Sequence, residues 1–215
     1  KNWFVIFWVS KRSQKRTTKN KKMKIGLYFG TFNPIHVGHL IIANYMVENS
    51  DLDEIWMVVT PHNPFKKKST LLDNNHRFEM VYKATENYPK IKPSAIEFKL
   101  PQPNYTVHTL AHISDRYQDK EFCLIMGEDN LNSLHKWKNY ETILEHHHIY
   151  MYPRITEEPL DTRFNTHPKI HKVAAPIVQI SSKMIRKGIK EQKNIQPLLS
   201  KKVWEYVDEM NFYRK

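Results

Sequence analysis

Short apolar runs alternate with segments of helical periodicity along this chain, and this alternation constrains the fold more than any other feature. Each apolar run has the length of a buried strand, and most of the segments between them carry apolar residues on one helical stripe. Such alternation indicates βαβ units, so we predict the α/β class, with an open, mainly parallel sheet and helices on both faces. The predicted strands are 24–30, 54–60, 91–98, 121–127, 148–153 and 172–180. The predicted helices are 37–49, 74–87, 106–117, 139–146, 182–190 and 198–210.

The positive charge of the chain is concentrated at its N-terminus. The 215 residues have a formal net charge of +12, but residues 1–22 hold eight of the 34 Lys and Arg residues and no acidic residue. The other 26 basic and 22 acidic residues leave +4, which is no signature of nucleic-acid binding. We therefore expect a basic extension outside the fold at 1–22, a single domain at 23–215, and no nucleic-acid partner. A nucleotide- or nucleic-acid-binding module without catalysis stays the alternative.

Apolar runs and cysteine content bear on the compartment. No apolar run approaches the roughly 20 residues that span a bilayer, so we expect no membrane partner. The one cysteine, Cys123, lies in an apolar run, which excludes a disulfide framework and favours a reducing, cytoplasmic compartment. The oligomeric state leaves no trace in the sequence.

Two histidines stand where the first predicted strand turns into the first predicted helix, in the stretch "GTFNPIHVGHL". We expect Gly30 to allow the sharp turn and Gly38 to leave room for a ligand. His36 and His39 are three residues apart, so they share one face of the first helical turn. A helix N-terminus attracts phosphate, and imidazoles add donors, so we interpret both as phosphate ligands. The alternative is that each histidine is only a helix cap or a satisfied core residue. A zinc site fits less well because no third ligand lies in this turn.

A second phosphate-binding pattern follows the last predicted strand, in "ISSKMIR" at 180–186. Ser181 and Ser182 are good helix N-caps, and Arg186 falls four residues after Ser182 on the same face. Both patterns lie at the carboxyl ends of predicted strands, where open parallel sheets bind ligands. The polar segments 61–72 and 153–169 are predicted loops at the same strand ends.

These motifs resemble those of a known family. The first resembles the HxGH signature of the nucleotidyltransferase superfamily, and "ISSKMIR" resembles the ISSTxIR signature of adenylyltransferases. "TPHNPFKKK" (60–68), "NYTVHTL" (104–110) and "GEDNLNSLHKW" (127–137) resemble segments of bacterial nicotinate-nucleotide adenylyltransferases. The resemblance covers roughly residues 24–210. It departs from the family pattern at Asn33, where Asp is more usual, and at Phe65–Lys66, which leaves open which lysine of 66–68 meets the substrate.

The resemblance implies a Rossmann-like nucleotidyltransferase fold and adenylyl transfer from ATP to nicotinate mononucleotide, with Mg²⁺ bound mainly through the ATP phosphates and no protein metal site. Nicotinamide mononucleotide and pantetheine phosphate stay open as alternative acceptors. The implied catalytic residues are His36 and His39. The implied ATP-binding residues are Gly30, Thr31, Phe32, His36, His39, Gly127, Asp129, Ser181, Ser182 and Arg186. The implied mononucleotide-binding residues are Thr31, Phe32, Asn63, Lys66, Thr106 and Trp137.

The resemblance also implies individual roles. Asp129 would bind the ribose of ATP, Lys66 the phosphate of the mononucleotide, and Thr106 with Trp137 the nicotinate ring. Ordinary structural roles stay open for these residues: Asp129 and Thr106 as helix caps, Trp137 as a core residue, Lys66 as part of a solvated run. Arg154 receives no role, because its segment matches the family only loosely.

Overall fold

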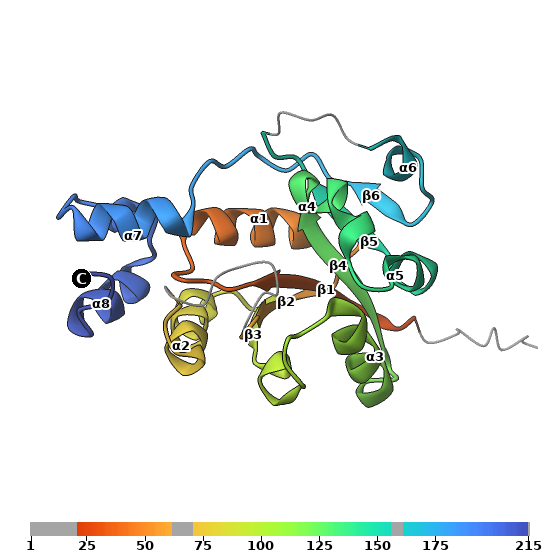
Figure 1. Cartoon of the computed structure of the whole chain (residues 1–215), viewed down its shortest axis with the longest axis horizontal. Coiled ribbons are helices and arrows are strands. Elements are labelled where there is room, and N and C mark those ends of the chain that lie inside the picture. Colours follow the sequence, from red (N-terminus) through yellow and green to blue (C-terminus); the bar gives the residue numbers. More distant parts are fainter. Residues whose placement is uncertain (1–20, 62–70, 156–160, 215) are drawn as a thin grey trace, which may run out of the picture.

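The computed structural model describes residues 21–61, 71–155 and 161–214. Within them, six strands form one sheet in the order β3-β2-β1-β4-β5-β6, and all neighbouring strands pair in parallel (Figure 1). The strand bounds are β1 Met23–Gly30, β2 Glu54–Val59, β3 Ile91–Ser94, β4 Lys120–Gly127, β5 Ile149–Tyr152 and β6 Ile170–Lys172. The predicted α/β class is confirmed. The chain order reverses between the neighbours β1 and β4, so their carboxyl ends form the topological switch point where such sheets bind ligands.

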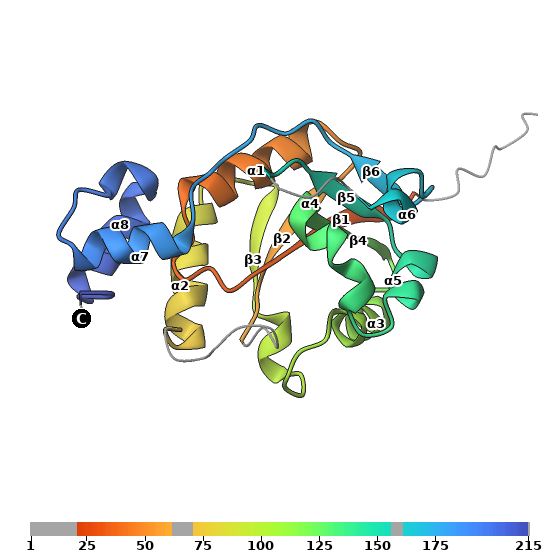
Figure 2. The same ribbon diagram turned by 45° about the horizontal axis from the view of Figure 1, so that its top comes forward.

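Helices cover both faces of the sheet, as predicted (Figure 2). One buried cluster packs β1 and β2 against α1, α2, α7 and α8, and the other packs β1 and β4 against α3, α4, α5 and α6. The helix bounds are α1 Val37–Glu48, α2 Asn74–Thr85, α3 Thr106–Arg116, α4 Glu128–Asn132, α5 Tyr140–His146, α6 Thr162–Asn165, α7 Ser182–Lys190 and α8 Lys201–Glu209. The 3-10 turns within the described ranges are η2 Ile96–Lys99, η3 Leu134–Lys136 and η4 Gln196–Leu198. No helix of the described residues is long and apolar enough to cross a membrane.

Two predicted strands are wrong in extent. The strand predicted at 91–98 ends at Ser94 and continues as the 3-10 turn η2. The strand predicted at 172–180 belongs to the sheet only as far as Lys172, the last residue of β6. Its remainder contains Pro176, which cannot donate a ladder hydrogen bond. This remainder instead runs alongside α1 toward α7 (Figure 2), with Val178 against Gly38.

The predicted helices at 37–49, 74–87, 106–117, 139–146 and 182–190 each match a helix of the structure to within two residues. The last predicted helix, 198–210, begins only at Lys201, after the 3-10 turn η4. The predicted loop at 153–169 contains α6, where the Asp161 side chain caps the first turn by accepting from the Arg163 N–H. Most of the predicted loop at 61–72 lies outside the described residues.

Candidate active site

The corner between β1 and α1 presents both predicted histidines at the first turn of α1. His36 is the N-cap residue and is 5% exposed. Its ring stacks on the ring of His39, with the two centroids 3.7 Å apart. Nδ1 of His39 accepts a hydrogen bond of 3.2 Å from the main-chain N–H of His36. In the neutral tautomer the ring proton of His39 is therefore on Nε2, which can donate to a phosphate oxygen.

Burial lowers the pKa of His36 to about 4, and the positive charge of Arg154 acts in the same direction. His36 is therefore neutral at pH 7 and suits a hydrogen-bonding role better than proton transfer. Its Nδ1 is buried and has no hydrogen-bond partner among the described residues.

The lowered pKa of His36 predicts a specific pH dependence of stability. The pKa of His36 in the folded state lies below the ordinary 6.5. The contribution of neutral His36 to the free energy of unfolding is therefore complete above pH 6.5 and is lost as the pH falls toward 4. Between these values the free energy of unfolding should fall by about 3 kcal/mol more in the wild type than in His36→Asn. Urea unfolding of both proteins from pH 8 to pH 4 measures this difference, and parallel pH profiles would contradict the assignment.

Three side chains hold the main-chain carbonyl groups of the turn between β1 and α1. Two come from α7 and one comes from α2. The two from α7 belong to the second phosphate motif, which we predicted at the same edge of the sheet as the first. Arg77 donates to the Thr31 carbonyl at 2.6 Å, Arg186 to the Asn33 carbonyl at 2.7 Å, and Ser182 to the Pro34 carbonyl at 2.8 Å. Ser181 is the N-cap of α7, where its hydroxyl accepts from the Met184 N–H. The two motifs thus meet in space although they are far apart in the sequence.

The sharp turn after β1 falls on Phe32 and not on Gly30, which corrects the prediction. Phe32 has a φ of 44°, in the left-handed region that bulky residues disfavour, whereas no glycine of the described residues has a positive φ. Gly30 serves close packing instead: a Cβ there would lie 2.7 Å from Cζ of Phe32. The buried Phe32 ring meets the His39 ring edge-on, with centroids 5.1 Å apart.

Gly38 also plays a different part from the one predicted. A Cβ at this position would lie 2.9 Å from Cγ1 of Val178 and 3.0 Å from Nδ1 of His36. The space beside Gly38 is therefore taken by protein atoms. The absent side chain lets the segment before α7 and the His36 ring pack close to α1.

Asp129 and Arg154 approach each other over Gly127, where β4 and β5 end. Nε of Arg154 lies 3.9 Å from Oδ1 of Asp129. A Cβ on Gly127 would come within 2.5 Å of that same oxygen. Gly127 itself is the N-cap of α4 and no side chain caps this helix, so Asp129 is not a cap. Sequence reasoning gave Arg154 no role, although a residue just past the carboxyl end of a parallel strand is a site candidate by position.

The residues predicted to meet the nicotinate ring lie at the start of α3 and after η3. Thr106 is the first residue of α3 and Tyr105 is its N-cap, so the cap role left open for Thr106 is wrong. Trp137 is half-buried and packs at the edge of the α3-side core. Nζ of Lys138 lies 4.6 Å from the centroid of the Tyr105 ring, so the two segments are neighbours.

Two predicted residues, Asn63 and Lys66, lie outside the described residues. The part of the chain that the structure describes holds no group of three or more His, Cys, Asp or Glu side chains that could bind a metal ion.

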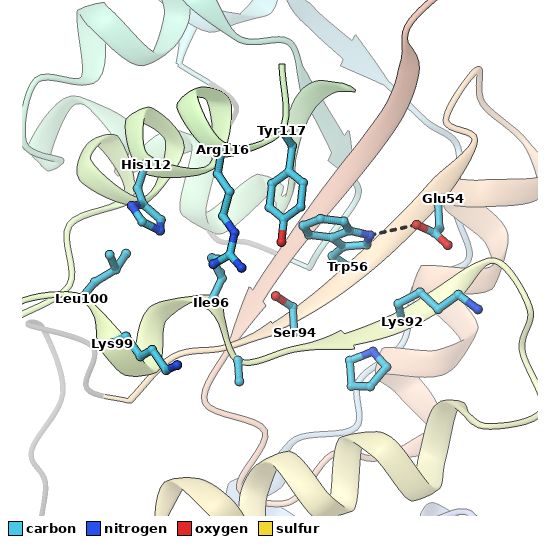
Figure 3. Close-up of a pocket in the computed structure, with 12 residues that line it drawn as sticks. Glu54, Trp56, Lys92, Ser94, Ile96, Lys99, Leu100, His112, Arg116 and Tyr117 are labelled. Carbon is cyan, nitrogen blue, oxygen red and sulfur yellow. Dashed lines mark hydrogen bonds between the residues drawn. The ribbon is translucent and has the colours of Figure 1, made fainter. Parts of the chain in front are cut away.

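A separate pocket of about 570 Å³ lies between α3 and the strands β2 and β3 (Figure 3). Trp56 forms part of its floor and donates from Nε1 to Glu54 at 2.8 Å. Lys92, Lys99 and Arg116 also line it. None of the predicted site residues lines this pocket, so it is distinct from the histidine corner.

Comparison with known proteins identifies the class first. The cytidylyltransferase-like family model matches residues 27–188, and the chain belongs to this family of nucleotidyltransferases. A solved structure titled Plasmodium falciparum nicotinic acid mononucleotide adenylyltransferase complexed with NaAD aligns with a TM-score of 0.76 at 20% identity. The alignment covers 88% of this chain and 97% of that chain and confirms the Rossmann-like nucleotidyltransferase fold.

Curated relatives identify the particular family. A Flavobacterium johnsoniae protein named "Probable nicotinate-nucleotide adenylyltransferase" is 70% identical over 193 residues, covering 90% of this chain and 100% of the relative. A Flavobacterium psychrophilum protein of the same name is 69% identical with the same coverage. The chain belongs to the nicotinate-nucleotide adenylyltransferase family.

Proposed function

We propose that this chain transfers the adenylyl group of ATP to nicotinate mononucleotide, giving nicotinate adenine dinucleotide and pyrophosphate in NAD biosynthesis. The observation that carries the proposal is the stacked histidine pair at the switch point of the sheet, facing the start of α7. The names of the close relatives support the choice of acceptor.

The reaction is a displacement at the α-phosphorus of ATP. A phosphate oxygen of the mononucleotide forms the new bond to this phosphorus, and the bond to the pyrophosphate oxygen breaks. The attacking phosphate is already ionised at neutral pH, so the enzyme needs no strong general base and forms no covalent intermediate. Its work is to position the two substrates and to stabilise charge on the α-phosphate and the leaving pyrophosphate.

In this mechanism His36 and His39, at the corner between β1 and α1, bind the phosphates of ATP. Nε2 of His39 donates to the α-phosphate, and the neutral His36 orients the ATP phosphates. Support comes from the hydrogen bond that fixes the His39 ring and from the stacking of the His36 ring on it. The N-terminal part of α7, with its N-cap Ser181, Ser182 and Arg186, binds the β- and γ-phosphates.

The remaining predicted residues complete the two substrate sites. Asp129 binds the ribose of ATP beside Gly127, and Arg154 adds positive charge near the phosphates, since it lies close enough to affect the pKa of His36. Thr106 and Trp137 bind the nicotinate ring. The other proposed contacts are Gly30 and the main chain of Thr31 and Phe32 near both substrates, and Asn63 and Lys66 near the mononucleotide phosphate.

ATP enters as its Mg²⁺ complex, and the ion is held mainly by phosphate oxygens and water, because Mg²⁺ commonly binds through substrate phosphates with few protein ligands. The cytoplasm as the place of reaction stays a prediction, supported by the single buried, free cysteine Cys123.

The acceptor can be tested directly. The protein is incubated with ATP, Mg²⁺ and one acceptor at a time, and pyrophosphate release is recorded. We expect the highest kcat/KM with nicotinate mononucleotide. A higher kcat/KM with nicotinamide mononucleotide or pantetheine phosphate would show that the proposed acceptor is wrong. No pyrophosphate release with any of the three acceptors would refute the proposed adenylyltransferase activity.

A further inference from the structure

The C-terminal end of the chain reaches the turn that carries the two histidines. Beyond α8, residues 210–213 fold back beside α7 and α8, where the C-terminus is marked in Figure 1. There the hydroxyl of Tyr213 donates to Oδ1 of Asn33 at 2.7 Å. Asn33 is 1% exposed, so this contact lies in the interior. The two residues are 180 positions apart in the sequence.

The C-terminal segment is held in place by contacts of its own. The Phe212 N–H donates to the Val207 carbonyl at 3.0 Å, and the Phe212 ring packs on His76 with centroids 4.9 Å apart. Arg214 pairs with Asp208 of α8. Tyr213 has a φ of 64°, which costs free energy for an aromatic residue and persists only where surrounding contacts impose it. These contacts therefore hold the Tyr213 hydroxyl in a fixed position beside Asn33.

Asn33 receives more than this one bond. Its Oδ1 also accepts from the Leu72 N–H at 3.3 Å, and its main-chain carbonyl accepts from Arg186 at 2.7 Å. Burial raises the pKa of Tyr213, so its hydroxyl stays protonated and remains a donor. Asn33 thus joins the C-terminal segment, the residues before α2 and the start of α7 to the turn that precedes His36.

We propose that Tyr213 is a positioning residue for adenylyl transfer: through Asn33 it fixes the turn that sets the orientation of His36 and His39. The side-chain oxygen of Asn33 then fastens the C-terminal segment to the turn. This inference rests on the proposed function for its kinetic consequence, but its structural consequence can be measured without substrate.

The kinetic test compares Tyr213→Phe with Tyr206→Phe. Tyr206 lies in the same region and its hydroxyl hydrogen-bonds Nδ1 of His76 at 2.8 Å, so its loss also removes one hydrogen bond but leaves the turn untouched. We expect kcat to fall about 3- to 10-fold in Tyr213→Phe, the range of one lost hydrogen bond, and less than about twofold in Tyr206→Phe. The KM for ATP should change less than kcat, because the misplaced groups act mainly in the transition state. Equal kcat values for the two variants would overturn the proposal.

Two further measurements keep the result specific. Imidazole NMR signals of His36 and His39 in the substrate-free protein should shift in Tyr213→Phe and not in Tyr206→Phe; unchanged signals in Tyr213→Phe would refute the positioning role even if kcat fell. If the signals shift while no acceptor is adenylylated, the positioning holds and the proposed function fails.

In an Asn33→Ala background, adding Tyr213→Phe should lower kcat by less than a further twofold. In an Asn33→Asp background, which keeps the acceptor oxygen, the full effect of Tyr213→Phe on kcat should remain. An effect of Tyr213→Phe that persists undiminished in Asn33→Ala would show that Tyr213 does not act through Asn33.

Discussion

Replacing Arg77 with methionine should lower the free energy of unfolding by about 3–5 kcal/mol, because several buried acceptors lose their donor and each unsatisfied group costs about 1–3 kcal/mol. Arg77 is 0% exposed and lies on α2. Its guanidinium donates to five oxygen atoms: the carbonyls of Thr31, Thr60, Pro61 and Leu72 and Oδ1 of Asn74. Methionine fills a similar volume but leaves these acceptors without their donor. Because the donors join the ends of β1 and β2 to α2, the loss should also loosen the turn before His36.

Urea unfolding measures this change, and Arg116→Met is the matched control. Arg116 lies at the exposed end of α3 with its guanidinium over the face of the Tyr117 ring, and 5.5 Å separate the guanidinium carbon from the centroid. Its replacement should cost less than about 1 kcal/mol. Arg77→Lys should recover only part of the loss, since one ammonium cannot reach all five acceptors. A loss for Arg77→Met no larger than that of the control would show that the network is not a stabilising element.

Replacing His39 with alanine should reduce kcat about 100- to 1,000-fold, the usual cost of losing one preorganised donor to a developing charge. The ring of His39 is fixed from three sides: its Nδ1 accepts from the His36 N–H, one face stacks on His36, and Phe32 meets it edge-on. The fixed ring needs no reorganisation to place Nε2 at the α-phosphate. Steady-state pyrophosphate release measures the loss.

Two controls separate catalysis from folding in this experiment. His112→Ala, on the exposed face of α3, should keep kcat within about twofold of the wild type. Unfolding of His39→Ala by urea should remain cooperative, since the change removes a hydrogen bond at the helix start and not a core element. Near wild-type turnover in a folded His39→Ala variant would exclude the proposed role.

The sequence predicted the layers of this protein and the place of its site because both depend on local patterns. The alternation of apolar runs and helical stripes is a local property, and α7 at Ser182–Lys190 agrees with its prediction at both ends. The first phosphate motif combines a strand end with a helix start, which places it at the carboxyl edge of a parallel sheet. The second motif lies at a helix start, but it does so after an irregular segment and not directly after a strand.

What sequence reasoning missed depends on contacts between distant segments. Arginine on a helix is usually exposed to solvent, so the sequence gives no sign that Arg77 is buried. Its burial depends on the surrounding carbonyl groups, which accept hydrogen bonds from its guanidinium. The contacts of Tyr213 and Arg154 could not be predicted either. Both residues lie in irregular segments, and the periodicity of apolar residues predicts helices and strands but not the course of such segments. The sharp turn at Phe32 was assigned to Gly30 because glycine is the usual residue for such a turn, and the strained φ of Phe32 follows from tertiary packing.

The exchange of labelled pyrophosphate into ATP tests the central claim most directly, since direct transfer to nicotinate mononucleotide and transfer through a covalent adenylyl-enzyme differ in what the exchange requires. Direct transfer predicts no exchange with ATP, Mg²⁺ and pyrophosphate alone, and exchange once nicotinate mononucleotide is added. Exchange without any acceptor would contradict a mechanism of positioning and charge stabilisation. A complete lack of exchange in the presence of nicotinate mononucleotide would contradict the proposed reaction itself.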